Sequence, residues 1–326
     1  MSKIKFTHDY NYIISSENLL GAWREFLKGK KSRKDTQLFS FRLIENIAHL
    51  YNDLLSGKYT HGPYEAFKIN DPKPRSIHKS SVRDRLLHHA VYRQLYPFFD
   101  RIFIADSFSC RVNKATYKAT KRFKAFYLKE SSNETRTCWI LKCDIRKFFE
   151  NIDHQIFLDI LRKYISDQNI INLLKNIIYS FSSAHGRGLP LGNLTSQLFV
   201  NIYMNEFDQF VKHKLKAKYY IRYADDSVVL SSDKSLLEEL LPKMGDYLKE
   251  ELKLDLHPDK ISIKTIFSGV DFLGWVHFPD HRILRSTTKN RMIRNLQVNK
   301  SQETKASYLG LLKHGNTYSI KKRLNW

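Results

Sequence analysis

Apolar residues recur at helical spacing in several long segments of the first part of the chain. They lie three or four positions apart in residues 16–28, 39–59 and 81–99, and this spacing predicts an amphipathic helix in each segment. Residues 64–79 follow another pattern, in which a short alternating run leads through a proline-marked turn into a second run. That pattern predicts a β-hairpin set among helices.

The remainder of the chain mixes strand and helix patterns. Strands are predicted at 139–145, 260–266 and 271–278, a hairpin at 219–232, helices at 154–165 and 234–252, and a glycine-marked loop leading into a long helix at 188–215. This order of strand, helix, hairpin, helix and strand predicts an α+β fold in which helices cover one face of a sheet. No internal repeat or low-complexity tract interrupts the order.

The chain carries a large excess of positive charge. Its 326 residues include 55 Lys and Arg against 33 Asp and Glu, for a formal net charge of +22. Because the basic residues are spread along the chain, we expect contact with a polyanion over several surfaces. The alternatives are a soluble protein that is merely basic and one attracted to an acidic membrane, and no strongly amphipathic basic helix at either terminus favours the membrane.

The sequence also indicates in which cellular compartment the protein is expected. It has no run of about 18 apolar residues that would predict a membrane span, and its N-terminus lacks the apolar core of a signal peptide. The three cysteines, Cys110, Cys138 and Cys143, follow neither a disulfide pattern nor a zinc-ligand spacing. We therefore expect reduced thiols in a cytoplasmic protein that does not enter membranes.

Two adjacent aspartates, Asp225 and Asp226, stand between the strand-like runs YYIRY and SVVLSS. A hairpin turn alone favours Asp, because its side chain accepts hydrogen bonds from nearby backbone amides. Adjacent buried carboxylates repel each other, however, unless they are protonated or bind cations. Asp144 ends another predicted strand, and three such carboxylates suit a pair of Mg²⁺ ions about 4 Å apart, as in nucleotidyl transfer. Mn²⁺ is the alternative ion.

Several motifs, taken in their order, resemble those of reverse transcriptases, and the resemblance covers nearly the whole chain. The segments that resemble the family's palm motifs are LKCDIRKFFENIDH, GLPLGNLTSQLFVNIY, YADD and LHPDK. DFLGW resembles the primer-grip hairpin, and FKINDPKPRSIHK resembles the fingers hairpin. The resemblance implies a right-hand polymerase fold with fingers, a palm with an antiparallel sheet, and a small helical thumb. It also implies an RNA-directed DNA polymerase whose catalytic metal ligands are Asp144, Asp225 and Asp226.

The same resemblance assigns residues to the substrates. For the incoming deoxynucleotide triphosphate it implies Lys68, Arg75, Phe149, Leu191, Gly192, Gln197 and Lys260. For the template and primer it implies Arg111, Lys114, Gly274 and Trp275. Each assignment has a structural alternative: Arg75 as a surface arginine, Phe149 as a core residue and Gly192 as a plain loop glycine. Phe148 and Phe149 are expected on a strand, so that only one faces the site and rejects a 2′-hydroxyl by clash.

Two departures from the common pattern point to a subgroup. Most reverse transcriptases have glutamine where this chain has Leu191, and they have a serine–proline pair where it has Ser196–Gln197. The segment LGNLTSQ is instead similar to the motif of reverse transcriptases from diversity-generating retroelements. This similarity implies an error-prone enzyme that works with a small helical accessory oligomer or a second protein. An antiphage-defence reverse transcriptase with a dedicated non-coding RNA is one alternative. A catalytically inactive RNA-binding protein on a polymerase scaffold is another, and the three aspartates argue against it.

The domain organisation is predicted from the same motifs. We expect an N-terminal helical extension at 1–63, fingers and palm at 64–276, and a basic helical thumb at 277–326. Residues 281–326 hold 11 Lys and Arg against one acidic residue, Glu303, which favours a thumb lying along template RNA or an RNA–DNA hybrid. A disordered basic tail is the alternative. We expect neither ribonuclease H nor endonuclease activity, and a bacterial or phage gene as the source.

Overall fold

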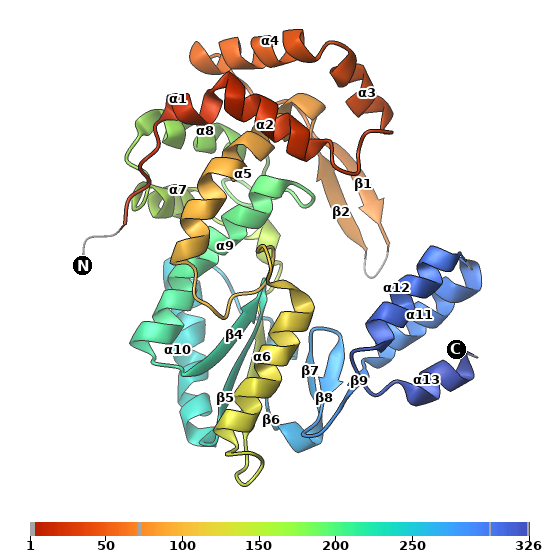
Figure 1. Cartoon of the computed structure of the whole chain (residues 1–326). Coiled ribbons are helices and arrows are strands. Elements are labelled where there is room, and N and C mark those ends of the chain that lie inside the picture. The colour runs from red at the N-terminus through yellow and green to blue at the C-terminus, as the bar shows by residue number, and fades with distance from the viewer. Residues whose placement is uncertain (1–3, 71–73, 300, 325) are drawn as a thin grey trace. The chain divides into compact units, whose positions relative to one another are not determined.

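The computed structural model describes residues 4–70, 74–299, 301–324 and 326, which divide into two compact units. Unit 1 contains the described residues of Met1–Ala105, Arg146–Gln209 and Tyr247–Asp255. Unit 2 contains Asp106–Ile145, Phe210–Asp246 and the described residues of Leu256–Trp326. Figure 1 labels most of the helices and strands of both units. None of the described helices combines the length and apolar content needed to cross a membrane.

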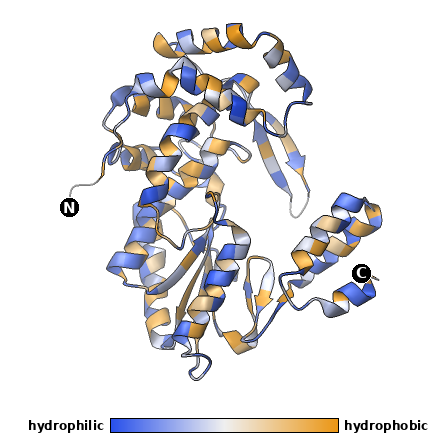
Figure 2. Cartoon of the chain, in the orientation of Figure 1, coloured by the Kyte–Doolittle hydropathy of each residue, from blue (hydrophilic) through white to orange (hydrophobic). Residues whose placement is uncertain are grey.

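Unit 1 is mainly helical, and its central helix, α5 (Val82–Ile102), packs against α1, α2, α3 and α9. The other helices are α1 (Tyr10–Ile14), α2 (Ser16–Phe26), α3 (Lys34–Phe41), α4 (Leu43–Leu55), α7 (His154–Arg162), α8 (Gln168–Tyr179) and α9 (Leu194–Gln209). In Figure 2, orange hydrophobic segments alternate with blue ones along α4 and α5, as expected of helices with one buried face. The Ser81 side chain caps α5 by accepting a hydrogen bond from the Asp84 backbone amide, 3.1 Å away.

The helix predicted over residues 39–59 is interrupted. The structure has α3 and α4 instead, separated at Arg42, whose φ of −116° and ψ of 41° are not helical. The apolar spacing continues across the break, so the pattern could not reveal it. The predicted stop at Gly57 fits the structure, because Gly57 adopts a φ of 68°, which glycine reaches without strain.

The predicted hairpin over residues 64–79 is present in unit 1 as β1 (Glu65–Ile69) and β2 (Arg75–Lys79). The two strands are antiparallel, and Ile69 pairs with Arg75. The turn that the prolines predicted falls partly on residues 71–73, which lie outside the described residues. All residues of β1 and the first two residues of β2, Arg75 and Ser76, are exposed.

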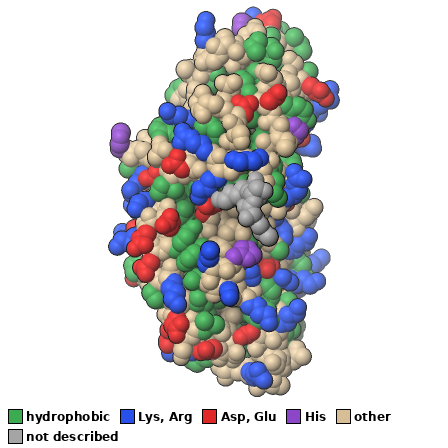
Figure 3. All heavy atoms as spheres, turned by 90° about the vertical axis from the view of Figure 1, so that its left-hand side faces the viewer, with side chains coloured by type: hydrophobic (Ala, Val, Ile, Leu, Met, Phe, Trp, Pro, Cys, Tyr) green, Lys and Arg blue, Asp and Glu red, His purple; other side chains and the backbone are tan. Residues whose placement is uncertain are grey.

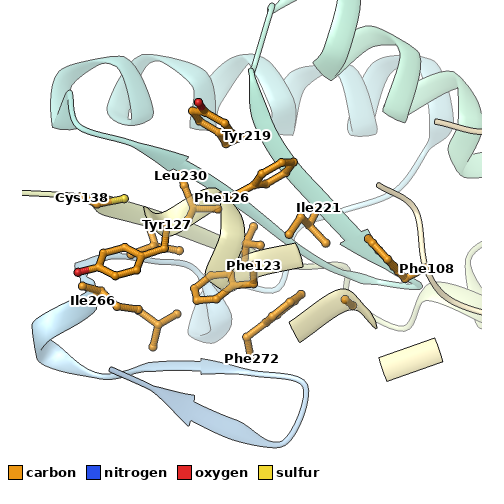
Figure 4. Packing of buried hydrophobic residues seen from close by; sticks show 14 residues of the cluster. Phe108, Phe123, Phe126, Tyr127, Cys138, Tyr219, Ile221, Leu230, Ile266 and Phe272 are labelled. Carbon is orange, nitrogen blue, oxygen red and sulfur yellow. The ribbon is translucent and has the colours of Figure 1, made fainter. Parts of the chain in front are cut away.

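Unit 2 is built on a four-stranded antiparallel sheet with the strand order β4–β5–β3–β6. The strands are β3 (Trp139–Asp144), β4 (Tyr219–Tyr223), β5 (Asp226–Ser231) and β6 (Ser262–Thr265), and α6 (Ala115–Glu130) packs on one face. Figure 4 shows Phe123 and Phe126 of α6 packed with Ile221 and Leu230 of the sheet. Because side chains alternate along a strand, the residues of β5 that share this face are Asp226, Val228 and Leu230. The helix α10 (Lys234–Leu252) follows β5 in the sequence; its residues up to Asp246 belong to unit 2 and those from Tyr247 to unit 1.

A second, three-stranded sheet of unit 2 has the order β7–β8–β9. Its strands are β7 (Val270–Phe272), β8 (Trp275–His277) and β9 (Arg282–Leu284), and the helices that follow are α11 (Ser286–Val298), α12 (Gln302–Leu312) and α13 (Tyr318–Arg323). Phe272 of this sheet is buried in the same apolar cluster as Phe123, whereas Trp275 belongs to a separate cluster with Met292 and Leu312. The pairing of Phe272 with Trp275 puts both side chains on one face of the small sheet, which thus meets α6 at Phe272 and the C-terminal helices at Trp275.

On one face of the molecule the surface charges are dispersed, and the cysteines are free thiols. On the face drawn in Figure 3, Lys and Arg side chains are spread among acidic ones rather than gathered in one patch. All three cysteines are free, and Cys138 and Cys143 are buried while Cys110 is exposed. Burial raises the pKa of the Cys138 thiol and of the Cys143 thiol to about 12.

Candidate active site

The register of the unit 2 sheet brings the three predicted metal ligands to one end of it. β3 and β5 are antiparallel, and Asp144, the last residue of β3, pairs with Asp226, the first residue of β5. Tyr223 also pairs with Asp226, so Ala224 and Asp225 form a two-residue turn beside them. The Ile145 backbone amide donates to the Asp225 carbonyl oxygen at 3.1 Å and ties the turn to the end of β3.

The turn is held in a strained conformation by a buried cation. Ala224 has a φ of 56°, a left-handed conformation that costs a residue with a side chain about 1–2 kcal/mol. Arg222 is only 1% exposed, and its guanidinium donates to the Ala224 carbonyl oxygen at 3.0 Å and to the Ser107 hydroxyl at 3.2 Å. Its backbone amide donates to the Asp106 carbonyl oxygen at 3.0 Å. A buried guanidinium needs such partners, and here they also fix the turn that carries Asp225.

Two lysines lie against the carboxylates. The Lys260 ammonium is 2.6 Å from Asp144 Oδ1, and the Lys142 ammonium is 3.5 Å from Asp226 Oδ2. Burial raises the pKa of the Asp226 carboxyl to about 7; the neighbouring Lys142 opposes this rise, and Asp144 and Asp225 add to it. The carboxylates are thus close enough to one another for their charges to be costly without a cation.

The donor set fits a divalent metal by its chemistry. Asp226 Oδ1 is buried and has no hydrogen-bond partner, although a buried carboxylate oxygen normally has one. Carboxylate oxygens are the ligands that Mg²⁺ prefers. Within the described part of the chain, no three His, Cys, Asp or Glu side chains already converge on one metal position. Asp226 therefore offers a free oxygen, while Asp144 faces Lys260.

The predicted nucleotide residues of the β1–β2 hairpin lie in unit 1. Lys68 on β1 and Arg75 on β2 are exposed and lie on adjacent register pairs, since Lys68 pairs with Ser76 and Ile69 with Arg75. Because these pairs differ by one register step, the Lys68 and Arg75 side chains leave opposite faces of the hairpin. Each is an exposed cation of a kind that suits phosphate oxygens.

Leu191 and Gly192 lie in a loop of unit 1 that contacts the same hairpin. The His78 backbone amide donates to the Leu191 carbonyl oxygen at 3.0 Å. Gly192 has a φ of 108°, and a Cβ built there would lie 2.8 Å from Ile77 Cγ2, so a side chain is excluded on both grounds. The close approach that Gly192 permits is therefore one between the loop and β2. Gln197 is exposed on α9.

The strand expected at Phe148 and Phe149 was wrong. β3 ends at Asp144, and Phe148–Glu150 form a short 3₁₀ helix after Lys147, whose φ of 46° turns the chain. Phe148 is buried and Phe149 is half-buried, with the Phe149 carbonyl oxygen accepting from the Leu189 amide at 2.8 Å. The two rings still have different environments, but the cause is a helical turn and not the alternation of a strand.

The four residues expected at template and primer lie in unit 2 and contact their own protein neighbours. The Arg111 guanidinium donates to the Ser107 carbonyl oxygen at 3.0 Å, and the Lys114 ammonium lies 5.2 Å from the centre of the Phe108 ring. Gly274, with a φ of 85°, follows Leu273 in the β7–β8 turn. Trp275 is buried, and the Arg282 guanidinium lies 5.1 Å from its ring centre.

Two cations at this site were not singled out from the sequence. Arg222 and Lys142 both contact the aspartate-bearing strands and turn. Lys142 had a usable signal, because it lies two residues before Asp144 and so shares its face of the strand. Arg222 had none, because an arginine in a strand is exposed far more often than buried.

Comparison with known proteins agrees with this geometry. The family description that matches residues 68–311 is "Reverse transcriptase (RNA-dependent DNA polymerase)". The chain belongs to the reverse transcriptase family. By family, this reverse transcriptase is an RNA-directed DNA polymerase, as the motifs predicted.

Relatives of this reverse transcriptase include bacterial and yeast proteins. It is 26% identical over 316 residues to Protein YkfC of Escherichia coli, covering 83% of this chain and 80% of YkfC. It is 25% identical to the group II intron-encoded protein LtrA of Lactococcus lactis, covering 88% of this chain and 58% of LtrA. Identity to the putative COX1/OXI3 intron 2 protein of Saccharomyces cerevisiae is 20%, covering 66% of this chain and 31% of that protein.

Solved structures with the same fold include telomerases. The reverse transcriptase matches telomerase from Candida albicans with a TM-score of 0.52 and 12% identity, covering 73% of this chain and 51% of that one. It matches apo telomerase from Candida tropicalis with a TM-score of 0.51 and 12% identity, covering 70% of this chain and 55% of that one. The predicted α+β right-hand polymerase fold is confirmed by these likenesses, which concern the fold alone.

Proposed function

We propose that this chain copies an RNA template into complementary DNA by two-metal nucleotidyl transfer. The observation that carries the proposal is the pairing of Asp144 with Asp226 beside the Asp225 turn, with a buried and unpartnered oxygen on Asp226. Two Mg²⁺ ions, or Mn²⁺ in their place, would lower the pKa of the primer 3′-hydroxyl and neutralise the leaving pyrophosphate. Asp144, Asp225 and Asp226 would hold these ions, and the tie between Ile145 and Asp225 would keep the carboxylates in position.

The substrate roles proposed for other residues follow the family motifs. Lys68, Arg75 and Lys260 supply cations for the triphosphate, and Phe149 supplies the bulk that rejects a 2′-hydroxyl. Arg111, Lys114, Gly274 and Trp275 are assigned to template and primer, with Gly274 and Trp275 acting through the β7–β8 hairpin that they shape. The domains proposed are the helical extension at 1–63, fingers and palm at 64–276, and the thumb at 277–326. A bacterial or phage-encoded cytoplasmic enzyme is the setting that these assignments suit.

A primer-extension assay tests this function directly. With a DNA primer annealed to an RNA template, four deoxynucleotide triphosphates and Mg²⁺, we expect full-length complementary DNA, no product in EDTA, and recovery when Mg²⁺ is restored. Ribonucleotide triphosphates should support little extension. Tight RNA binding without incorporation in either Mg²⁺ or Mn²⁺ would refute the proposal and favour the inactive RNA-binding alternative.

Binding of the template–primer should weaken steeply with salt. The net charge of +22 predicts that several phosphates are contacted, and six to ten contacts would reduce affinity by about 10³-fold or more between about 50 and 200 mM salt. Fluorescence anisotropy with a labelled RNA–DNA hybrid measures this dependence. An affinity that stays constant over that range would contradict a backbone-dominated mode of binding.

Leu191 supports a more specific proposal, that this enzyme is the error-prone reverse transcriptase of a diversity-generating retroelement. A leucine side chain cannot donate or accept the hydrogen bond that glutamine offers at this position, so selection of the correct base pair should weaken. We expect Leu191→Gln to lower the misincorporation frequency opposite template adenine severalfold in sequenced primer-extension products. Leu191→Met, which has no amide, is the matched control and should keep the wild-type frequency. Equal error rates in wild type and Leu191→Gln would refute the link.

The biological setting can be tested through the nucleic acid and the partner. A retroelement enzyme should co-purify with RNA that matches a repeat in a neighbouring variable gene, and with a small helical accessory oligomer. A defence enzyme should instead co-purify with a structured RNA that has no such repeat. Sequencing the RNA bound to the purified protein separates the two roles.

A further inference from the structure

Lys142 occupies a central place between the predicted metal ligands and the small sheet. It lies on β3, where Ile140, Lys142 and Asp144 alternate onto one face of the four-stranded sheet. Ile140 belongs to the apolar cluster on that face, so the Lys142 ammonium stands between an apolar core and the carboxylates. Its side chain is only 15% exposed, which is unusual for lysine and requires polar partners.

The ammonium of Lys142 is shared by two acceptors from different sheets. It donates to the Asp271 carbonyl oxygen on β7 at 2.6 Å and lies 3.5 Å from Asp226 Oδ2 on β5. The shorter contact anchors the lysine on β7, and the longer one leaves it within ion-pair distance of the carboxylate. One side chain thus joins the strand that carries a predicted metal ligand to the strand that begins the β7–β8 hairpin.

The contact at Asp271 continues toward α11. The Asp271 carboxylate accepts from Arg285 Nε at 2.7 Å, and Arg285 is the residue that precedes the first turn of α11. The Arg285 backbone amide also donates to the Gly274 carbonyl oxygen in the β7–β8 turn at 3.1 Å. β7 is therefore fixed on one side by Lys142 and on the other by Arg285.

We infer that Lys142 is a positioning residue that couples cation binding at Asp226 to the order of the β7–β8 hairpin. A divalent cation on Asp226 repels the ammonium at 3.5 Å and leaves it wholly to the Asp271 carbonyl, which strengthens its hold on β7. By reciprocity, anything that orders β7 and draws Lys142 toward it frees Asp226 for a cation. The inference rests on the proposed function, because it takes Asp226 as a metal ligand.

Hydrogen exchange measured by mass spectrometry, with and without Mn²⁺ and without nucleic acid, tests the coupling. In the wild-type chain, Mn²⁺ should slow exchange of the backbone amides in residues 270–277 by about fivefold or more. Lys142→Met keeps the apolar stem but removes the ammonium, and it should lose this effect while still binding Mn²⁺. Binding is verified separately by electron paramagnetic resonance of free Mn²⁺.

Lys234→Met is the matched control. Lys234 lies on α10 in the same unit, and its ammonium pairs with Glu238 at 2.8 Å, away from the carboxylates. This variant should show the wild-type slowing. If Lys142→Met does not fold, Lys142→Gln carries the same expectation, because its shorter side chain cannot reach both acceptors.

The outcomes separate this inference from the function on which it rests. Wild-type protein that binds Mn²⁺ without slower exchange in residues 270–277, or a Lys142→Met variant that retains the slowing, would overturn the coupling and leave the polymerase proposal intact. A wild-type chain that binds no Mn²⁺ would refute the metal assignment itself. Activity in primer extension remains an independent readout of the polymerase.

Discussion

Substitution of Asp226 by asparagine should reduce deoxynucleotide incorporation by about 10³-fold or more. The amide keeps the shape of the side chain but removes the charge that a divalent cation requires, and Asp226 Oδ1 is a buried oxygen without a hydrogen-bond partner. Single-turnover primer extension, with Mg²⁺ varied up to saturation, measures the loss. Saturating Mg²⁺ should not restore the rate, because the missing ligand is part of the chemistry and not only of binding.

The thermal stability of the Asp226→Asn variant should not fall with its activity. Asp226 is a buried carboxylate whose pKa is raised to about 7, so its charge is costly in the folded protein. We expect Asp226→Asn to melt no lower than the wild type, as is common where a site is strained for function. Asp280→Asn is the control, because Asp280 is an exposed carboxylate of the same unit, and it should retain activity. Activity of Asp226→Asn within tenfold of wild type would exclude the metal assignment.

Truncation of Phe272 to alanine should destabilise unit 2 by about 3–5 kcal/mol. Phe272 is fully buried and packs against Phe123 of α6, with ring centres 5.6 Å apart (Figure 4). The substitution removes one of the apolar contacts between the small sheet and α6. Chemical denaturation, monitored by hydrogen exchange in peptides of unit 2, measures the loss of unfolding free energy. A local readout is needed because a chain of two units need not unfold in one step.

Phe267 offers a matched control for this prediction. It is 63% exposed and lies in a short 3₁₀ helix, Ile266–Ser268, of the same unit. Phe267→Ala should therefore change the unfolding free energy by less than about 0.5 kcal/mol. Equal effects of the two truncations would show that the small sheet does not depend on the α6 core.

The elements around the aspartates could be predicted from sequence, whereas the helices α1, α6 and α8 were missed. β3 and the β4–β5 hairpin carry strong apolar runs, and both were predicted within one or two residues of their observed ends. α6 was missed because lysines and arginines fill its exposed face and obscure the apolar positions Ala119, Phe123 and Phe126. α8 was also missed, although Asp167 caps it and its apolar spacing is regular.

The candidate site could be predicted as residues but not as contacts. Three carboxylates at strand ends and a turn were visible in the sequence, since hairpin geometry brings neighbouring strand ends together. The pairing of Asp144 with Lys260 and of Asp226 with Lys142 depends on the register of β3 against β5 and β6, which apolar patterns do not specify to one residue. The buried guanidinium under the turn depends on the same tertiary detail.

The different environments of the three thiols give the wild-type protein a practical property. A maleimide fluorophore reacts with the thiolate form of an accessible cysteine, and Cys138 and Cys143 are both buried with strongly raised pKa values. Cys110 is exposed and lies beside Arg111, in the segment that leads into α6. The unaltered chain can therefore carry a single dye at Cys110 without any engineered cysteine, and the dye would test the proposed contact of Arg111 with template or primer.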